Sequence, residues 1–148
     1  MPNSSTTTEA DLIDTNVISE ILRPQPAPQV VVWLESLTGD VAITTVTLAE
    51  LLAGVRRLPD SRRRSVLSAR IDAALQPYRD SRSILAFDDK AADHYAEVFV
   101  AREKTGMPIS MADAQIAAIC RTHRASCATR NTKDFADTGI ALINPWTG

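Results

Sequence analysis

The stretch that decides the fold is the first apolar segment and the residues after it, Leu12-Ile13-Asp14-Thr15-Asn16-Val17-Ile18-Ser19-Glu20. The pair Leu12-Ile13 predicts a short strand. The residues after Asp14 predict a helix that stops before Pro24, because a proline disfavours helical geometry in the residue before it. A strand that passes directly into a helix begins a βα unit, and the rest of the chain repeats this alternation.

Further short apolar runs rich in β-branched residues predict four more strands, at residues 41–44, 84–87, 126–129 and 140–143. Segments with helical period lie between them, at residues 29–37, 47–58, 60–78, 90–105 and from Ser110 onward. This alternation predicts an α/β fold around a parallel sheet. The sequence shows no repeat and no linker to a second domain, so we expect one domain from residue 11 to residue 148.

The composition is that of one compact domain, with 148 residues of which 45% are hydrophobic. A chain of this size can bury roughly two-thirds of its unfolded surface. Its apolar runs are no longer than about five residues, whereas a membrane helix needs about 20. We therefore exclude an integral membrane protein.

Residues 1–10 are polar and rich in Ser and Thr, which predicts a disordered leader. They lack the basic region and the apolar core of a secretion signal, so we expect a cytoplasmic chain. Cys120 and Cys127 are then expected to be thiols. The 16 basic and 18 acidic residues give a net charge of −2, which by itself argues mildly against a nucleic-acid partner.

Carboxylates are predicted beyond the C-terminal ends of the strands, where open parallel sheets bind ligands. They are Asp14 at the end of the first strand, Glu50 and Asp113 in the first turns of two helices, and Asp134 just after the fourth strand. Their predicted polar neighbours are Asn16, Thr44, Thr45 and Asn131. Four carboxylates in one cleft repel each other unless a cation is present. Oxygen ligands without a Cys/His cluster suit Mg²⁺, or Mn²⁺ in its place.

Each acid also has a purely structural interpretation as a helix cap. Thr47-Leu48-Ala49-Glu50 and Ser110-Met111-Ala112-Asp113 fit the capping box, in which the acid folds back onto the amide of the first residue. Asp14 could cap the first helix, and Asp134 could cap the turn at residues 135–136. Spacing alone leaves both interpretations open.

The four predicted acids lie in four short segments, which are the stretch 12–20 quoted above, Thr44-Thr45-Val46-Thr47-Leu48-Ala49-Glu50-Leu51, Met111-Ala112-Asp113-Ala114-Gln115-Ile116-Ala117-Ala118 and Ala128-Thr129-Arg130-Asn131-Thr132-Lys133-Asp134-Phe135. In this order they resemble the motifs of PIN-domain ribonucleases, in particular the VapC-type toxins of bacterial toxin–antitoxin pairs. The ending Ile143-Asn144-Pro145-Trp146 is also similar to that of the family. The likeness extends from Asp11 onward, and the leader before it is the one departure.

This resemblance implies a PIN-like three-layer α/β fold, with a central parallel five-stranded sheet in the order 3-2-1-4-5 flanked by helices. Residues 11–148 would form a single PIN domain. It also implies a metal-dependent endoribonuclease toxin that forms a homodimer, with acidic residues that match Asp14, Glu50, Asp113 and Asp134. A VapB-type antitoxin would wrap the toxin, block its cleft and supply the part that binds operator DNA.

Phosphodiester hydrolysis requires activated water and neutralisation of the charge that builds up on the phosphate, and Mg²⁺ can supply both. We expect Asp14, on the rigid end of the first strand, to be the central ligand and Asp113 to be a second one. Glu50 and Asp134 would either bind the metal or orient water beside it. Supporting groups and phosphate contacts are expected from Asn16, Asn131, Arg130 and Lys133. With the four acids set aside, 14 acids remain against 16 bases, so the net charge no longer argues against RNA.

Two surfaces have open interpretations. The densest basic stretch is either a solvated helix face or a contact for RNA or for acidic antitoxin residues, and consists of Arg56, Arg57, Arg62, Arg63, Arg64 and Arg70. The apolar run at residues 30–34 is too long for one buried helix face, so some of it is expected to meet another chain. The alternative is a helix buried on most sides.

Other functions fit the residues less well. A haloacid-dehalogenase-type phosphatase needs a second Asp two residues after Asp14, where Asn16 stands, and a receiver domain needs paired acids after the first strand. A catalytically silent PIN-like module that only binds RNA or protein is the remaining alternative, and the four intact acids argue against it. His94 and His123 are isolated and are not expected to act as bases, and Trp146 is expected to be a packing anchor.

Overall fold

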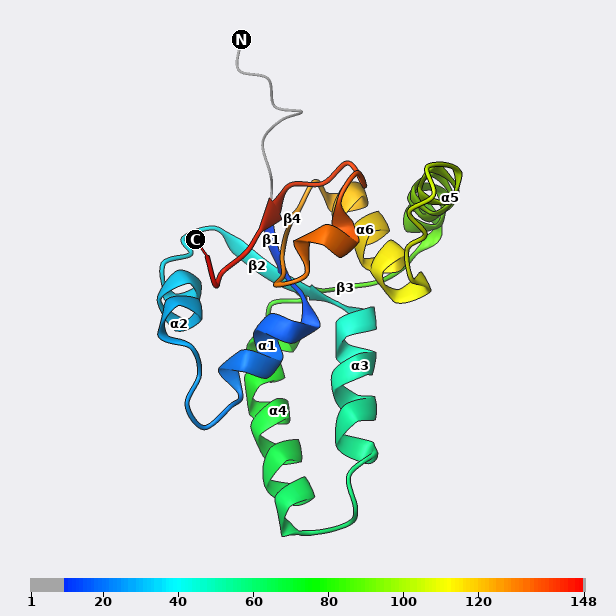
Figure 1. The fold of residues 1–148 in the computed structure, drawn as a ribbon. Coiled ribbons are helices and arrows are strands. Elements are labelled where there is room, and N and C mark those ends of the chain that lie inside the picture. The colour runs from blue at the N-terminus through cyan, green and yellow to red at the C-terminus, as the bar shows by residue number, and fades with distance from the viewer. Residues whose placement is uncertain (1–9, 148) are drawn as a thin grey trace.

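The computed structural model describes residues 10–147, and five parallel strands form its central sheet (Figure 1). The strands are β1 (Ala10–Ile13), β2 (Asp40–Thr44), β3 (Ile84–Leu85), β4 (Ser126–Ala128) and β5 (Leu142–Ile143). Their order is β3-β2-β1-β4-β5, which confirms the predicted topology and places β1 in the centre. The predicted leader lies outside the described residues except for Ala10, which is part of β1.

Helices cover both faces of the sheet. They are α1 (Thr15–Ile21), α2 (Pro28–Glu35), α3 (Thr45–Arg56), α4 (Arg62–Asp80), α5 (Asp89–Lys104) and α6 (Met111–His123), followed by the 3-10 turn η2 (Thr132–Phe135). Successive side chains of a strand point to opposite faces, so Leu12 and Ile13 belong to two different core clusters. Leu12 packs with residues of α5 and α6, whereas Ile13 packs with residues of α1 to α4. The three-layer architecture is therefore confirmed.

Several predicted boundaries are wrong by one or two residues, and two of them have a clear local reason. The helix α3 begins at Thr45 rather than Thr47, because the Thr44 hydroxyl accepts a hydrogen bond of 3.0 Å from the Thr47 amide and acts as the N-cap. The strand β3 ends at Leu85 rather than Phe87. Its partner strand β2 turns into α3 after Thr44, so β3 has nothing to pair with beyond that point.

The apolar run at residues 30–34 lies on α2, where it divides between core and surface. Val30 is fully buried, and Trp33 and Leu34 pack against the same core cluster. Val32 is 65% exposed. Contact of this helix with another chain stays a prediction. Within residues 10–147 no helix combines the length and the apolar character needed to cross a membrane.

Candidate active site

Asp14 leaves the C-terminal end of the central strand β1 and is almost completely buried. One carboxylate oxygen accepts a hydrogen bond of 2.8 Å from the Thr15 amide, so the residue does cap α1. The other oxygen accepts bonds from the Thr129 hydroxyl, at 2.8 Å, and from the Asn16 side-chain amide, at 3.3 Å. Burial raises the pKa of Asp14, and these hydrogen bonds oppose that effect. Asp14 is both a cap and a fixed carboxylate at the sheet edge.

Glu50 lies in the second turn of α3, one turn later than predicted, and its side chain is exposed. Because Thr44 caps this helix, the capping box proposed for residues 47–50 is wrong. The Glu50 carboxylate instead accepts a hydrogen bond of 2.6 Å from the Thr15 hydroxyl. Thr15 follows Asp14 directly, so this bond ties α3 to the start of α1 and brings a second carboxylate to the same edge.

Asp113 lies in the first turn of α6, and the Ser110 hydroxyl accepts a bond of 3.1 Å from its amide, which confirms Ser110 as the cap. Burial raises the pKa of the Asp113 carboxyl to about 6. The negative charges of the three other predicted acids act in the same direction. The Asp113 carboxylate is thus close enough to the three other acids, which come from separate segments, for their charges to act on it.

Asp134 lies inside the turn η2 and is exposed, so it does not cap residues 135–136. Its amide donates to the Asn131 carbonyl at 3.0 Å. The buried Arg102 donates to its carbonyl at 3.1 Å. These contacts fix the backbone of the turn, and the negative charge of Asp134 acts on Asp113.

A cleft of about 540 Å³ opens at this edge of the sheet. Its lining comes from α1, α3, α6, the β4–η2 loop and the C-terminus: Asp14, Thr15, Asn16, Ser19, Glu20, Arg23, Glu50, Asp113, Arg130, Asn131 and Trp146. Three of the four predicted acids and three of the four predicted supporting residues therefore share one cleft. Asp134 and Lys133 lie on the neighbouring turn η2 and do not line it.

Sequence reasoning missed the role of the buried Thr129, which bonds to Asp14 but does not line the cleft, and of several residues that do line it. Thr129 donates to Asp14 and accepts from the Asn131 amide at 3.1 Å, and its position just after β4 was the available signal. Trp146 is partly packed against the core, as predicted, but it also lines the cleft. The Arg130 guanidinium lies 5.0 Å from the centre of its ring, a cation–π contact that no sequence pattern indicated. Glu20 ends the stretch 12–20 quoted at the outset, but nothing in the sequence indicated its bond with Arg23 or that both residues line the cleft.

The remaining candidates lie outside this cleft. His94 and His123 do not line it. Cys120 and Cys127 are buried thiols, as predicted. In the basic stretch, Arg57 lines an adjacent hollow that shares Glu50 with the cleft. The other arginines of that stretch are exposed or half-buried, and their role stays open.

The cleft offers a divalent cation the right donor chemistry in an open arrangement. Within residues 10–147 no three His, Cys, Asp or Glu side chains lie close enough together to enclose an ion as they stand. Both oxygens of Asp14 and one of Glu50 already accept protein hydrogen bonds. The mutual repulsion felt by Asp113 is nevertheless what a bound cation would relieve, and carboxylates are the ligands that Mg²⁺ prefers. The donor set therefore fits.

Comparison with known proteins agrees with this fold and with the candidate site at this edge of the sheet. The family model described as the PIN domain matches residues 12–141. The chain belongs to the PIN-domain family. The match begins in β1 and ends just before β5, so it spans every element that supplies the predicted acids.

Two relatives of this PIN domain are named as a toxin and as a ribonuclease. It is 42% identical to Toxin FitB of Neisseria gonorrhoeae over 136 residues, which are 91% of this chain and 97% of FitB. It is 33% identical to VapC ribonuclease Y4jK of Sinorhizobium fredii over 136 residues, 91% of this chain and 96% of the relative. The resemblance to VapC-type toxins is thus confirmed.

Solved structures give the same grouping. The PIN domain superimposes on a chain of FitAcB from Neisseria gonorrhoeae with a TM-score of 0.85 and 41% identity, covering 92% of this chain and 98% of that one. VapBC2 from Rickettsia felis, solved with a DNA fragment from its promoter, matches with a TM-score of 0.77 and 26% identity, covering 91% and 98%. The chain is therefore a PIN domain of the FitB and VapC toxin group.

Proposed function

We propose that this protein is an Mg²⁺-dependent endoribonuclease toxin. The observation that carries the proposal is the cleft beyond the C-terminal end of β1, which Asp14, Glu50 and Asp113 line together. The negative charges of Asp14, Glu50 and Asp134 also act on Asp113. A relative with 33% identity over most of the chain is named a ribonuclease, which supports RNA as the substrate class. All five strands share one sheet, which supports the proposal that residues 11–148 form a single catalytic domain.

Asp14 and Asp113 would hold the cation, with Glu50 and Asp134 as further ligands or as groups that orient water. Mg²⁺, or Mn²⁺ in its place, would supply the charge that polarises the phosphate and activates water. Thr129 and Asn16 hold the Asp14 carboxylate in one orientation through hydrogen bonds of 2.8 and 3.3 Å. This fixed orientation leaves little reorganisation for the moment of reaction.

The other polar groups would bind the substrate. Asn16 accepts from the Arg130 amide at 3.2 Å, which places Asn131 and the Arg130 side chain on the cleft wall. Both would contact phosphate oxygens. Lys133, on the adjacent turn, would contact a phosphate further along the RNA.

Regulation would come from a VapB-type antitoxin that covers the cleft and carries the pair to operator DNA. A VapBC pair from Rickettsia felis with the same fold was solved on promoter DNA, which supports this part of the proposal. We further propose that the toxin forms a homodimer and acts in the cytoplasm.

Cleavage of RNA with Mg²⁺ and with EDTA tests the proposal. The parent is expected to cleave in Mg²⁺ and to stop in EDTA, and Asp14→Asn is expected to be inactive although folded. The exposed Asp72, on α4, supplies the matched control Asp72→Asn, which should cleave like the parent. Cleavage in EDTA would exclude metal dependence. A folded parent that binds RNA without cutting it would favour the catalytically silent module instead.

The RNA target can be found by mapping new 5′ ends in cellular RNA after brief expression. The inactive Asp14→Asn protein is the control for ends that arise without cleavage by this enzyme. Sites that appear only with the parent identify the target RNA and its sequence or loop context.

A further inference from the structure

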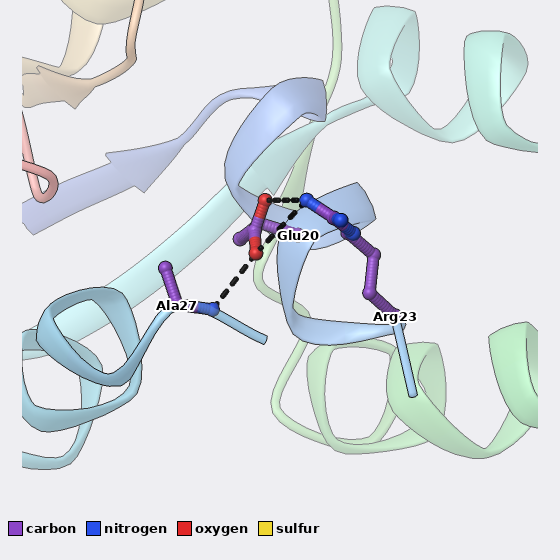
Figure 2. Close-up of polar contacts among 3 residues, drawn as sticks. All are labelled: Glu20, Arg23 and Ala27. Atoms are coloured by element: carbon purple, nitrogen blue, oxygen red, sulfur yellow. Dashed lines mark hydrogen bonds and ion pairs between the residues drawn. The ribbon is translucent and has the colours of Figure 1, made fainter. Parts of the chain in front are cut away.

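Glu20 is a carboxylate that the proposed chemistry does not use. It lies in α1 on the cleft wall and is only 6% exposed. One oxygen accepts a bond of 2.8 Å from the Ala27 amide and the other accepts one of 3.1 Å from Nη1 of Arg23 (Figure 2). The Ala27 amide and Arg23 hold the pKa of Glu20 below its usual value, so the group stays charged. Buried carboxylates are rare unless they are paired in this way.

Arg23 is held by one nitrogen and leaves the rest of its guanidinium free. Its side chain is 64% exposed and lines the cleft together with Asp14 and Asp113. Among residues 10–147, Nε and Nη2 of Arg23 have no hydrogen-bond partner. A guanidinium carries five donors in a rigid fork. The Glu20 contact therefore orients a donor group and leaves most of it available to a ligand.

The backbone around Arg23 is also restrained. The segment between α1 and α2 contains Pro24 and Pro26, whose rings fix φ. The bond from the Ala27 amide ties the far end of this segment back to Glu20. Fewer conformations must then be lost when Arg23 binds a ligand, which favours binding.

Charge identifies the kind of ligand. In the described part of the chain, the cleft lining holds two cationic side chains, Arg23 from the α1–α2 segment and Arg130 from the β4–η2 loop. Arg130 is fixed by its contact with Trp146, as Arg23 is fixed by Glu20. A polyanion that enters a cleft with several carboxylates needs cations beside them. Arginine forks match the geometry of phosphate oxygens.

We propose that Arg23 binds a backbone phosphate of the RNA substrate and that Glu20 is the positioning residue that presents it. The inference rests on the proposed ribonuclease function. It adds a substrate contact from the α1–α2 segment to the contacts expected at Arg130 and Lys133.

Binding of single-stranded RNA to Arg23→Gln tests the contact. The probe is a labelled RNA pool of random sequence, about 24 nucleotides long, in EDTA so that it is not cleaved. Affinity is expected to fall about tenfold, the loss typical of one charge-assisted hydrogen bond. The slope of log affinity against log salt should decrease by about 0.7, as for one lost contact to single-stranded RNA. In Mg²⁺ the KM should rise with kcat nearly unchanged.

Arg79→Gln is the matched control. Arg79 is exposed in the last turn of α4, next to the start of β3 and therefore at the opposite edge of the sheet. The Arg79→Gln substitution removes the same charge as Arg23→Gln but lies outside the cleft. The RNA affinity of this variant should therefore equal that of the parent. Arg23→Lys keeps the charge and should recover most of the salt slope but not all of the affinity.

The Glu20→Gln substitution tests the positioning role of Glu20. Whether it weakens or strengthens RNA binding decides if Glu20 acts through Arg23. Gln can still accept from the Ala27 amide, but it no longer pairs with the Arg23 charge. If Glu20 acts through Arg23, Glu20→Gln weakens RNA binding in the parent and has no effect on RNA binding in the Arg23→Gln background. If Glu20 is only a negative charge beside the cleft, the substitution strengthens binding in both backgrounds, which overturns this part of the proposal.

The two proposals fail in different ways. If the parent cleaves RNA and the Arg23→Gln variant binds and cleaves RNA equally well, only the proposed Arg23 contact is overturned. A parent that binds RNA through Arg23 but never cleaves it overturns the ribonuclease proposal alone. A parent that does not bind RNA overturns both. Loss of antitoxin affinity with unchanged RNA affinity in Arg23→Gln would assign Arg23 to the protein partner instead.

Discussion

Replacing Asp113 by asparagine is expected to stabilise the metal-free protein near neutral pH while it abolishes RNA cleavage. Burial raises the pKa of the Asp113 carboxyl from 3.8 to about 6, so the folded protein binds this proton more tightly than the unfolded chain does. The stabilisation from this proton is complete below the ordinary pKa and is lost as the pH rises through about 6. Above that pH the folded parent carries an unfavourable negative charge on Asp113, and the asparagine variant lacks this charge.

The size of the effect follows from the same shift. Moving the pKa from 3.8 to about 6 corresponds to about 3 kcal/mol at full strength. The side chain is only half-buried, so solvent screening reduces this to about 1.5 kcal/mol. The charge also favours the N-terminus of α6 by about 0.5 kcal/mol, which asparagine gives up. The expected gain is about 1 kcal/mol, or about 3 °C in Tm for a chain of this length.

Urea denaturation in EDTA at about pH 7.5 and at about pH 4 measures this gain. Asp113→Asn should exceed the parent at the higher pH and match it at the lower one. The exposed control Asp72→Asn should match the parent at both. An Asp113→Asn protein that is no more stable than the parent at about pH 7.5, or equally stabilised at both pH values, would refute the conclusion that burial and neighbouring charges disfavour the ionised Asp113 carboxylate.

Three substitutions test other contacts by urea denaturation. Thr44→Ala removes the cap of α3 and should cost about 1 kcal/mol, and no loss would mean that another group caps this helix. Thr129→Val removes the hydroxyl bonded to Asp14 and should cost about 1–2 kcal/mol and lower cleavage, whereas full activity would contradict its orienting role. Leu75→Ala empties a fully buried position and should cost about 2–5 kcal/mol, and a loss like that of a surface site would contradict the packing of α4.

The sequence predicted the architecture well because its signals are local. The alternation of short apolar runs with helical periods placed the strands within a few residues of their observed bounds, and Ser110 was identified correctly as a cap. The residues after each strand also indicated the sheet edge where the acids gather. The resemblance to PIN-domain toxins supplied the strand order, which the topology confirms.

Choices between equivalent local partners could not be read from the sequence. Thr44 and Thr47 are both good caps, and the end of β2 decides between them. The interaction that Glu50 makes with Thr15 joins residues 35 positions apart, which no local pattern indicates.

The sequence by itself determined the succession of βα units and the four acids at the ends of strands, because periodicity and capping depend on neighbouring residues. The tertiary structure alone decided which charges act on one another. The high pKa of Asp113 and the fixed place of Arg23 beside Glu20 both arise from burial and from contacts made only when α1, α3, α6 and the β4–η2 loop meet at one edge. Electrostatic energies depend on distance in space and on access to water, and folding sets both.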